Sequence, residues 1–232
     1  MNKKLLFTHI IFSSALCSSY TYSHEQDDPL LASIKVDKLE NSSEATHLDM
    51  NAWLGKDINK LWLKTDITQH EGKTEHAEVQ ALFSHAFAPY WDVQTGIRRD
   101  IRPSPSQTWG VIGVQGLAPY FFEIDAAIFI GEAGRTAARI SADYDLLFTQ
   151  RLILAPEIEI NAYGQNDMAT GTGSGVSNIS TGLRLRYEIR REFAPYIGLS
   201  WNKKLGNTAD FAKTGNEATS NTEWIIGIRA WF

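Results

Sequence analysis

The chain has 232 residues, a formal net charge of −5 at pH 7, 43% hydrophobic residues and a single cysteine. These values favour one folded domain and argue against a disordered, collagen-like or coiled-coil chain. An acidic chain without a basic stripe is also a poor ligand for nucleic acid, so we expect no nucleic-acid partner.

The first 23 residues have the layout of a secretory signal peptide. Lys3 and Lys4 precede an apolar stretch from Leu5 to Cys17, and Thr21-Tyr22-Ser23 offers a cleavage site. Cleavage there would remove the only cysteine, so the exported chain could not use disulfides. Beyond residue 30 no stretch reaches the roughly 18 uncharged apolar residues of a membrane-spanning helix.

Residues 24–56 are polar, rich in Ser, Asp and Glu, and show no sustained period. We predict a periplasmic, partly disordered N-terminal segment here, with some folded structure near Leu48 to Leu54. The predicted barrel then runs from residue 57 to residue 232.

From residue 57 onward, apolar and polar residues alternate in segments of about ten, which is the strand signal. Between Tyr120 and Ile130, for example, the even positions are apolar or aromatic, whereas Glu123 and Asp125 are odd. A soluble antiparallel sheet alternates too. The export signal, the charged second face and the last segment, which alternates from Trp224 to a terminal Phe232, favour a transmembrane antiparallel up-and-down β-barrel over a soluble sandwich.

Short turns alternate with longer polar connections along the chain, as they do in outer-membrane barrels. Three of the turns are predicted at Ala88-Pro89-Tyr90, Ala118-Pro119-Tyr120 and Ala194-Pro195-Tyr196 because proline cannot donate to a central strand ladder. Pro156 lies inside a strand pattern and predicts a bulge or a broken ladder. The pattern gives ten strands, or twelve if 47–55 supplies another together with one unrecognised strand. The ten predicted strands are 58–68, 74–87, 90–101, 107–117, 120–130, 135–148, 151–163, 175–190, 194–204 and 221–232.

The inward-facing positions carry many charges, and ten strands would leave only a narrow interior between them. The charges could form a structural salt-bridge network, because charges removed from water must be paired. Alternatively, an acidic wall could line a path or site for cations. The predicted acidic wall is Glu123, Asp125, Asp143, Asp145, Glu157 and Glu159, and the predicted inward basic residues are Arg98, Arg139, Arg184, Arg186, Arg190 and Arg229.

Several long stretches from His47 onward resemble the copper resistance protein B family of Gram-negative outer membranes. They include 49–64, Thr74-Glu-His-Ala-Glu-Val-Gln80, Gly96-Ile-Arg-Arg-Asp100, 108–120, 149–157 and 183–196. The resemblance implies an outer-membrane barrel that binds copper ions or limits their passage. It also implies outer-membrane lipid, copper ions and periplasmic copper-resistance proteins as partners, with copper bound or transported rather than used in catalysis. The alternative function is a small structural or non-selective porin-like barrel without a specific metal site.

Family members often carry a long Met- and His-rich segment before the barrel, and thioether and imidazole groups suit copper. In this chain residues 24–56 contain only His24, His47 and Met50. This favours a copper-related role of the barrel itself over copper capture by the N-terminal segment. His47, Asp49 and Met50 could chelate one ion, although a solvated polar segment is the alternative. His70 and His76 could meet across the hairpin 58–87, or lie separately on a loop surface.

An enzyme of the outer-membrane phospholipase type would need a serine hydrogen-bonded to a histidine. Ser84 and His85 are adjacent and therefore point to opposite faces of a strand. His76 and Ser84 share a face but are eight residues apart. We therefore predict that the protein is not an enzyme.

Overall fold

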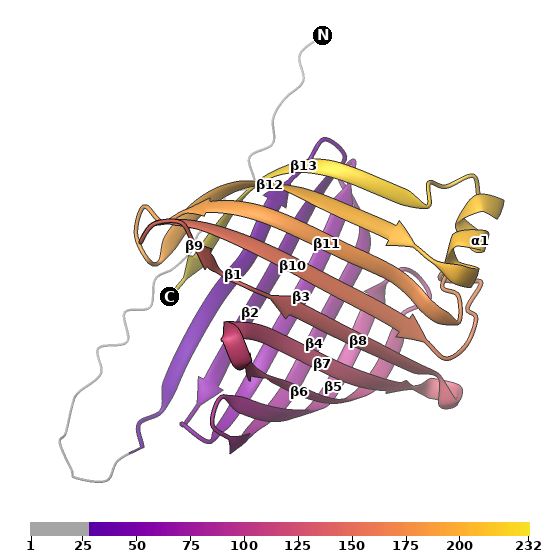
Figure 1. Ribbon diagram of the computed structural model, residues 1–232. Helices are drawn as coiled ribbons and strands as arrows, with labels where there is room; N and C mark the ends of the chain where they lie inside the picture. The colour runs from indigo at the N-terminus through magenta and orange to yellow at the C-terminus, as the bar shows by residue number, and fades with distance from the viewer. Residues whose placement is uncertain (1–27) are drawn as a thin grey trace.

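The computed structural model describes residues 28–232, so the predicted signal peptide and His24 lie outside the described residues. Twelve antiparallel strands form one closed barrel, and each strand pairs with the next along the chain (Figure 1). The barrel closes where β1 pairs with β13. Its strands are β1 (Leu31–Asn41), β2 (Ala45–Gly55), β3 (Asn59–His70), β4 (Lys73–Ala88), β5 (Trp91–Arg102), β6 (Gln107–Ala118), β7 (Phe122–Gly131), β8 (Thr136–Asp143), β10 (Leu152–Tyr163), β11 (Gly175–Tyr187), β12 (Phe193–Lys204) and β13 (Ser220–Trp231).

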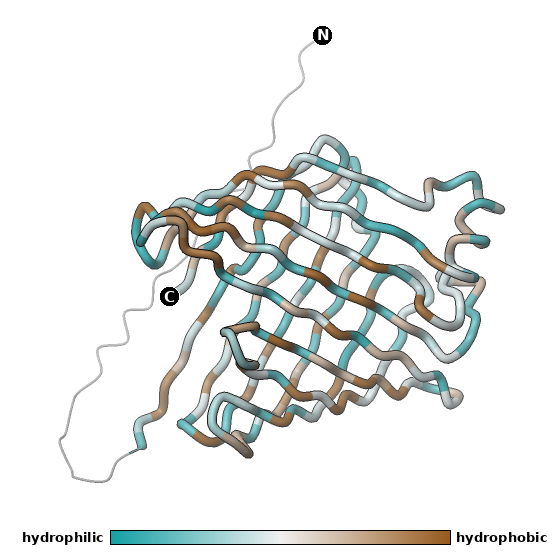
Figure 2. Tube along the Cα trace, viewed as in Figure 1, coloured by the Kyte–Doolittle hydropathy of each residue, from teal (hydrophilic) through white to brown (hydrophobic). Residues whose placement is uncertain are grey.

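The period-two pattern places apolar side chains on the outside of the barrel. Ile128, Ile140 and Ile226 are all more than half exposed there, as expected of side chains that would contact lipid. Brown and teal segments accordingly alternate along the strands in Figure 2. Polar residues fill much of the inside, where Glu78, Arg98 and other charged groups are buried. The predicted all-β antiparallel barrel is confirmed.

The larger of the two predicted strand counts is confirmed, and the segment 24–56 needs a correction. Within it, β1 and β2 are full barrel strands, so the barrel begins at Leu31 and not at residue 57. The expected strand at 47–55 is β2, and the unrecognised one is β1. A bulge between Val36 and Leu39 directs both Asp37 and Lys38 inward, which breaks the alternation by which a strand is recognised.

Two of the three Ala-Pro-Tyr segments are turns, as predicted, but the third is not. Pro195 lies inside β12, opposite Ile228 of β13. It is tolerated because pairing with β11 begins only at Tyr196, so no strand on that side needs its missing N–H group. The broken ladder predicted at Pro156 is present: pairing of β10 with β8 stops at Asp143 and resumes at Leu146 in the two-residue strand β9 (Leu146–Leu147).

The two ends of the barrel differ. One end, here called the terminus end, carries Leu31, Phe232 and the turns at 89–90 and 119–121. The other, the loop end, carries the connections 164–174 and 205–219, the second of which contains α1 (Gly206–Thr214) (Figure 1). Two short 3-10 turns, η1 (Pro119–Phe121) and η2 (Glu132–Gly134), complete the described elements. Among residues 28–232 no helix is both long and apolar enough to span a membrane.

Candidate functional site

The barrel encloses a cavity of about 1670 Å³. Its lining comes mainly from β1–β3 and from β7, β8 and β10–β13, whereas β5 contributes no residue to it. The interior is therefore not uniformly open. We call the inner side chains of β4–β6 that do not line the cavity, together with Phe129 and Arg139, the filled wall, and the rest of the cavity lining the open side.

The filled wall is held by an ion network around Glu78, which is 2% exposed. Arg98 lies 2.8 Å and Arg139 2.9 Å from its Oε2 atom. The Phe129 ring packs against both guanidinium groups, with its centroid 4.6 Å from Cζ of Arg98 and 5.7 Å from Cζ of Arg139. Leu82, Trp109, Val111 and Ala137 complete an apolar cluster there. These buried side chains pack against one another, and Glu78, Arg98 and Phe129 do not line the cavity.

All six carboxylates of the predicted acidic wall line the cavity. Strand register places Glu123, Asp143 and Glu157 side by side on β7, β8 and β10. Like charges in adjacent positions repel each other, so such a row needs cations or basic partners. Part of the wall has them. Lys64 Nζ is 2.6 Å from Asp125 and Lys38 Nζ is 2.8 Å from Glu157.

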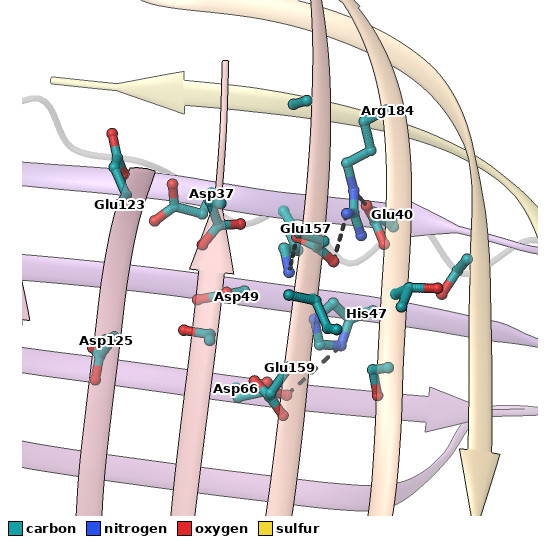
Figure 3. A pocket seen from close by; sticks show the side chains of 18 of the residues that line it. Asp37, Glu40, His47, Asp49, Asp66, Glu123, Asp125, Glu157, Glu159 and Arg184 are labelled. Carbon is teal, nitrogen blue, oxygen red and sulfur yellow. Dashed lines mark hydrogen bonds and ion pairs between the residues drawn. The ribbon is translucent and has the colours of Figure 1, made fainter. Parts of the chain in front are cut away.

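Lys38 and Lys64 belong to β1 and β3, so these pairs cross the cavity. Figure 3 shows Glu157 close to Arg184 and Glu40, with Glu123 and Asp125 on β7, in the same wall as β10. Arg186 pairs with Asp145 at 2.7 Å, and Nε of Arg139 lies 3.8 Å from Glu159. The wall is thus partly a salt-bridge network, which was one of the two predicted alternatives.

β1 supplies cavity-lining side chains that the alternation pattern did not predict. Asp37, Lys38 and Glu40 line the cavity, and Glu40 is 5% exposed. Glu40 accepts hydrogen bonds from Arg184 and from the Tyr196 hydroxyl. These residues would have been found if the segment Lys35–Glu40 had been read as an alternating strand with one inserted residue.

The open side carries more acid than base. Eleven carboxylates line the cavity, against seven lysines and arginines. Asp49, Asp66, Glu123 and Asp143 have no lysine or arginine within 4.0 Å among the described residues. They lie in two rows, Asp49 beside Asp66 on β2 and β3, and Glu123 beside Asp143 on β7 and β8. Uncompensated carboxylates around a water-accessible cavity favour cations over anions.

The predicted chelate of His47, Asp49 and Met50 is not assembled. His47 and Asp49 line the cavity, but Met50, between them, does not, because adjacent strand residues point to opposite faces. His76 lies opposite Thr68 and not opposite His70, whose partner is Lys73. His70 does not line the cavity.

His76 instead lies near His47. Nδ1 of His47 is 3.6 Å and Nε2 of His76 is 3.9 Å from the same atom, Oδ1 of Asp66. Among residues 28–232, no group of three or more His, Cys, Asp or Glu side chains is arranged to hold a metal ion as it stands. The two imidazoles and Asp66 nevertheless share one part of the cavity lining (Figure 3 labels His47 and Asp66).

The predicted inward arginines divide into three groups. Arg98 and Arg139 belong to the filled wall, and Arg184 and Arg186 face the open side. Arg229 also lines the cavity, with Nε 3.6 Å from Asp37. Arg190 was wrongly placed inside: it follows the end of β11, is exposed, and bridges to Phe193 in the turn.

Ser84 and His85 have separate partners, as their adjacency predicts. The Ser84 hydroxyl is fully buried and donates to Asp92, whereas Nδ1 of His85 lies 2.8 Å from Oδ1 of Asn59. The required serine–histidine hydrogen bond is therefore not formed by this pair.

The connection 164–174 covers the filled wall at the loop end. Asp167 accepts hydrogen bonds from Gln107 and Arg135, and the Thr208 hydroxyl on α1 binds the Gly173 N–H. Partial burial would raise the pKa of Asp167, but the hydrogen bonds from Gln107 and the Ala169 N–H, together with the charge of Arg135, hold it below its usual value. A smaller cavity of about 180 Å³ lies beneath this connection, and His76 lines both cavities.

Solved structures with a similar fold include porins. The NanC porin superposes with a TM-score of 0.55 at 11% identity, covering 86% of this chain and 99% of that structure. The KdgM porin gives a TM-score of 0.53 at 12% identity, with the same coverage. At these identities the likeness concerns the fold alone.

Sequence comparisons identify the family. The family model described as "Copper resistance protein B precursor (CopB)" matches residues 30–232. The copper resistance protein B homolog of Pseudomonas syringae pv. tomato is 44% identical over 223 residues, which are 94% of this chain and 76% of that protein. Copper resistance protein B of Escherichia coli is 46% identical over 183 residues, 79% of this chain and 62% of that protein. The chain therefore belongs to the copper resistance protein B family.

Proposed function

We propose that this barrel lies in the outer membrane of a Gram-negative cell, with the loop end outside, and contributes to copper resistance by binding copper ions in its cavity or controlling their passage through it. The apolar outer surface and the porin-like fold support the membrane location. Family membership supports copper as the ion. Periplasmic copper-resistance proteins are the partners that such a role would require.

The observation that carries this proposal is the excess of carboxylates on the open side. Asp49 and Asp66 face the cavity on one side, and Glu123 and Asp143 on the other, none with a lysine or arginine partner among the described residues. Their charges attract cations into the cavity, and the filled wall confines ions to this side.

Purified protein in vesicles that contain a copper-quenched dye would test passage. We expect faster quenching than in protein-free vesicles, and slower quenching in the Asp49→Asn/Asp143→Asn double variant. Asp210→Asn is the matched control, because Asp210 is exposed on α1 and its carboxylate pairs with the exposed Lys213 on the same helix. Cells lacking the gene should become more sensitive to copper. Quenching at the protein-free rate, together with unchanged copper tolerance, would contradict the proposal.

The second candidate is a small porin-like barrel without a metal role. The ion pairs that cross the cavity favour it, because a purely structural network would account for them. It predicts that potassium and copper cross in proportion to their concentrations, and that the Asp49→Asn/Asp143→Asn variant alters both fluxes equally.

A further inference from the structure

His47, Asp66 and His76 form a group, here called the trio, on the adjacent strands β2, β3 and β4. His47 and His76 both lie opposite Thr68, one on each side of β3. Asp66 is two residues further along β3 and so faces the same way. Both imidazoles therefore approach one carboxylate from opposite sides, at 3.6 and 3.9 Å from its Oδ1 atom.

The oxygen between the two rings lacks a compensating partner. Oδ1 of Asp66 is shielded from solvent and accepts no hydrogen bond from the described residues. Its neighbour in register on β2 is another carboxylate, Asp49, and on β4 it is Glu78, whose charge is already matched by Arg98 and Arg139. A shielded acceptor between two imidazoles and beside a second free carboxylate is a favourable place for a metal cation.

The donor types select the oxidation state of copper. Imidazole nitrogen and carboxylate oxygen suit Cu(II), whereas Cu(I) prefers thiolate and thioether sulfur. No Met or Cys lines the cavity of the described chain. Met50 is on the outer face, and Met168 is 83% exposed in the connection 164–174.

We propose that the trio is a Cu(II) site on the open side of the cavity, and that the barrel therefore handles Cu(II) and not Cu(I). This inference rests on the proposed function and specifies its ion and its ligands. Two donors bound to one copper ion lie about 3 Å apart, given metal–nitrogen bonds of about 2 Å. The two nitrogen–oxygen separations exceed this by less than 1 Å, and all three side chains are partly exposed to the cavity, so small rotations of the rings would let each nitrogen reach an ion bound to Asp66.

The site has a defined position relative to the other charges. His76 also lines the smaller cavity beneath the connection 164–174, so the trio lies toward the loop end. Glu123, near the start of β7, and Asp143, at the end of β8, lie toward the terminus end. An ion released from the trio would thus meet further uncompensated carboxylates at the opposite end of the same cavity.

Electron paramagnetic resonance of bound Cu(II) tests the site directly. All proteins would lack a histidine tag and carry His24→Gln, so that only barrel histidines can supply imidazole. With one equivalent of Cu(II), we expect hyperfine coupling to two imidazole nitrogens, lost in the His47→Gln/His76→Gln variant, whose affinity should fall at least tenfold. His85→Gln is the matched control, since His85 is exposed and lies beside Asn59. An unchanged spectrum in the double variant overturns the proposal.

A second variant protects the test against misfolding. Asp66→Asn keeps the size of the side chain and should weaken Cu(II) binding while the nitrogen couplings persist at saturating metal. Titration with Ag(I), a stand-in for Cu(I), should give weaker binding that none of these variants alters. Ag(I) binding tighter than that of Cu(II), and lost with the two histidines, would overturn the assignment of oxidation state.

Vesicle flux separates the failure of this inference from the failure of the proposed function. Copper flux without imidazole coupling in the wild-type spectrum would refute the trio and leave copper passage intact. Imidazole coupling without flux would support the trio and restrict the function to binding.

Discussion

The filled wall and the open side of this barrel share the same strand geometry but differ in whether their charged side chains are paired. On the filled wall, Glu78 and Arg98 are almost fully buried, and each charge has a partner in contact. On the open side, Asp49 and Asp143 face a water-accessible cavity, and no lysine or arginine of residues 28–232 lies within 4.0 Å of either carboxylate. The difference follows from solvation, because buried charges must be paired, whereas charges beside water can remain unpaired.

Removing the central charge of the filled wall should have the largest effect on stability and so tests the difference between the two regions most strongly. Glu78→Gln removes the carboxylate that Arg98 and Arg139 share and so breaks two buried ion pairs at once. The two guanidinium groups keep only their pairs with Asp100 and Glu159. Loss of one partner of a buried pair costs about 3–5 kcal/mol, and we expect the upper part of that range. Denaturant unfolding in lipid vesicles, followed by tryptophan fluorescence, would measure it. Glu123→Gln on the open side is the control, and equal losses in the two variants would contradict the division.

Truncating an aromatic side chain on each side gives the next largest contrast. Phe129→Ala should lower the free energy of unfolding by about 3–5 kcal/mol, toward the lower end of that range, because the ring is fully buried against Arg98 and Arg139. Trp53→Ala should cost less than half as much, because Trp53 lines the water-accessible cavity and its removal leaves no dry void. The same unfolding measurement applies. A larger loss for Trp53→Ala would show that the open side also supports the fold.

Removing a charge on the open side should change selectivity and leave stability almost unaltered. Asp143→Asn relieves repulsion from Glu123 and Glu157 in the same row. We expect the free energy of unfolding to change by less than about 1 kcal/mol. The reversal potential across a salt gradient should shift toward lower cation preference. A stability loss comparable to that of Glu78→Gln would instead assign Asp143 to the structural network.

The smallest expected effect concerns the connection 164–174 at the loop end. The partly exposed pair Asp167–Arg135 contributes about 0.2–1 kcal/mol. Because the pKa of Asp167 is lowered, this contribution is complete above the unfolded-state value near 4 and is lost as the pH falls through the lower folded-state pKa. Hydrogen exchange should therefore show the connection loosening at low pH. In Asp167→Asn the connection should be looser at neutral pH and lack this pH dependence, and an unchanged profile would contradict the role of Asp167.

Much of the fold could be predicted because strand alternation is a local property. Odd or even position in the strand is enough to place Ile128 on the outer face and Glu123 on the inner face. The six carboxylates of the predicted acidic wall do line the cavity. The prediction was wrong where the alternation of inward and outward residues is interrupted. The bulge at Asp37 and Lys38 concealed β1, and Pro195 resembled a turn residue because nothing local shows that β11 ends before reaching it.

The sequence by itself determined a closed antiparallel barrel with a charged interior and, through its long family-specific stretches, membership of the copper resistance protein B family. Only the tertiary structure decided which charges meet. Lys38 pairs with Glu157 across the cavity, and His47 and His76 both lie close to Asp66. These contacts form because barrel closure and strand register bring together residues that are distant in the chain. Residue type and spacing fix the face of a strand on which a side chain lies, whereas contacts between strands depend on register and curvature.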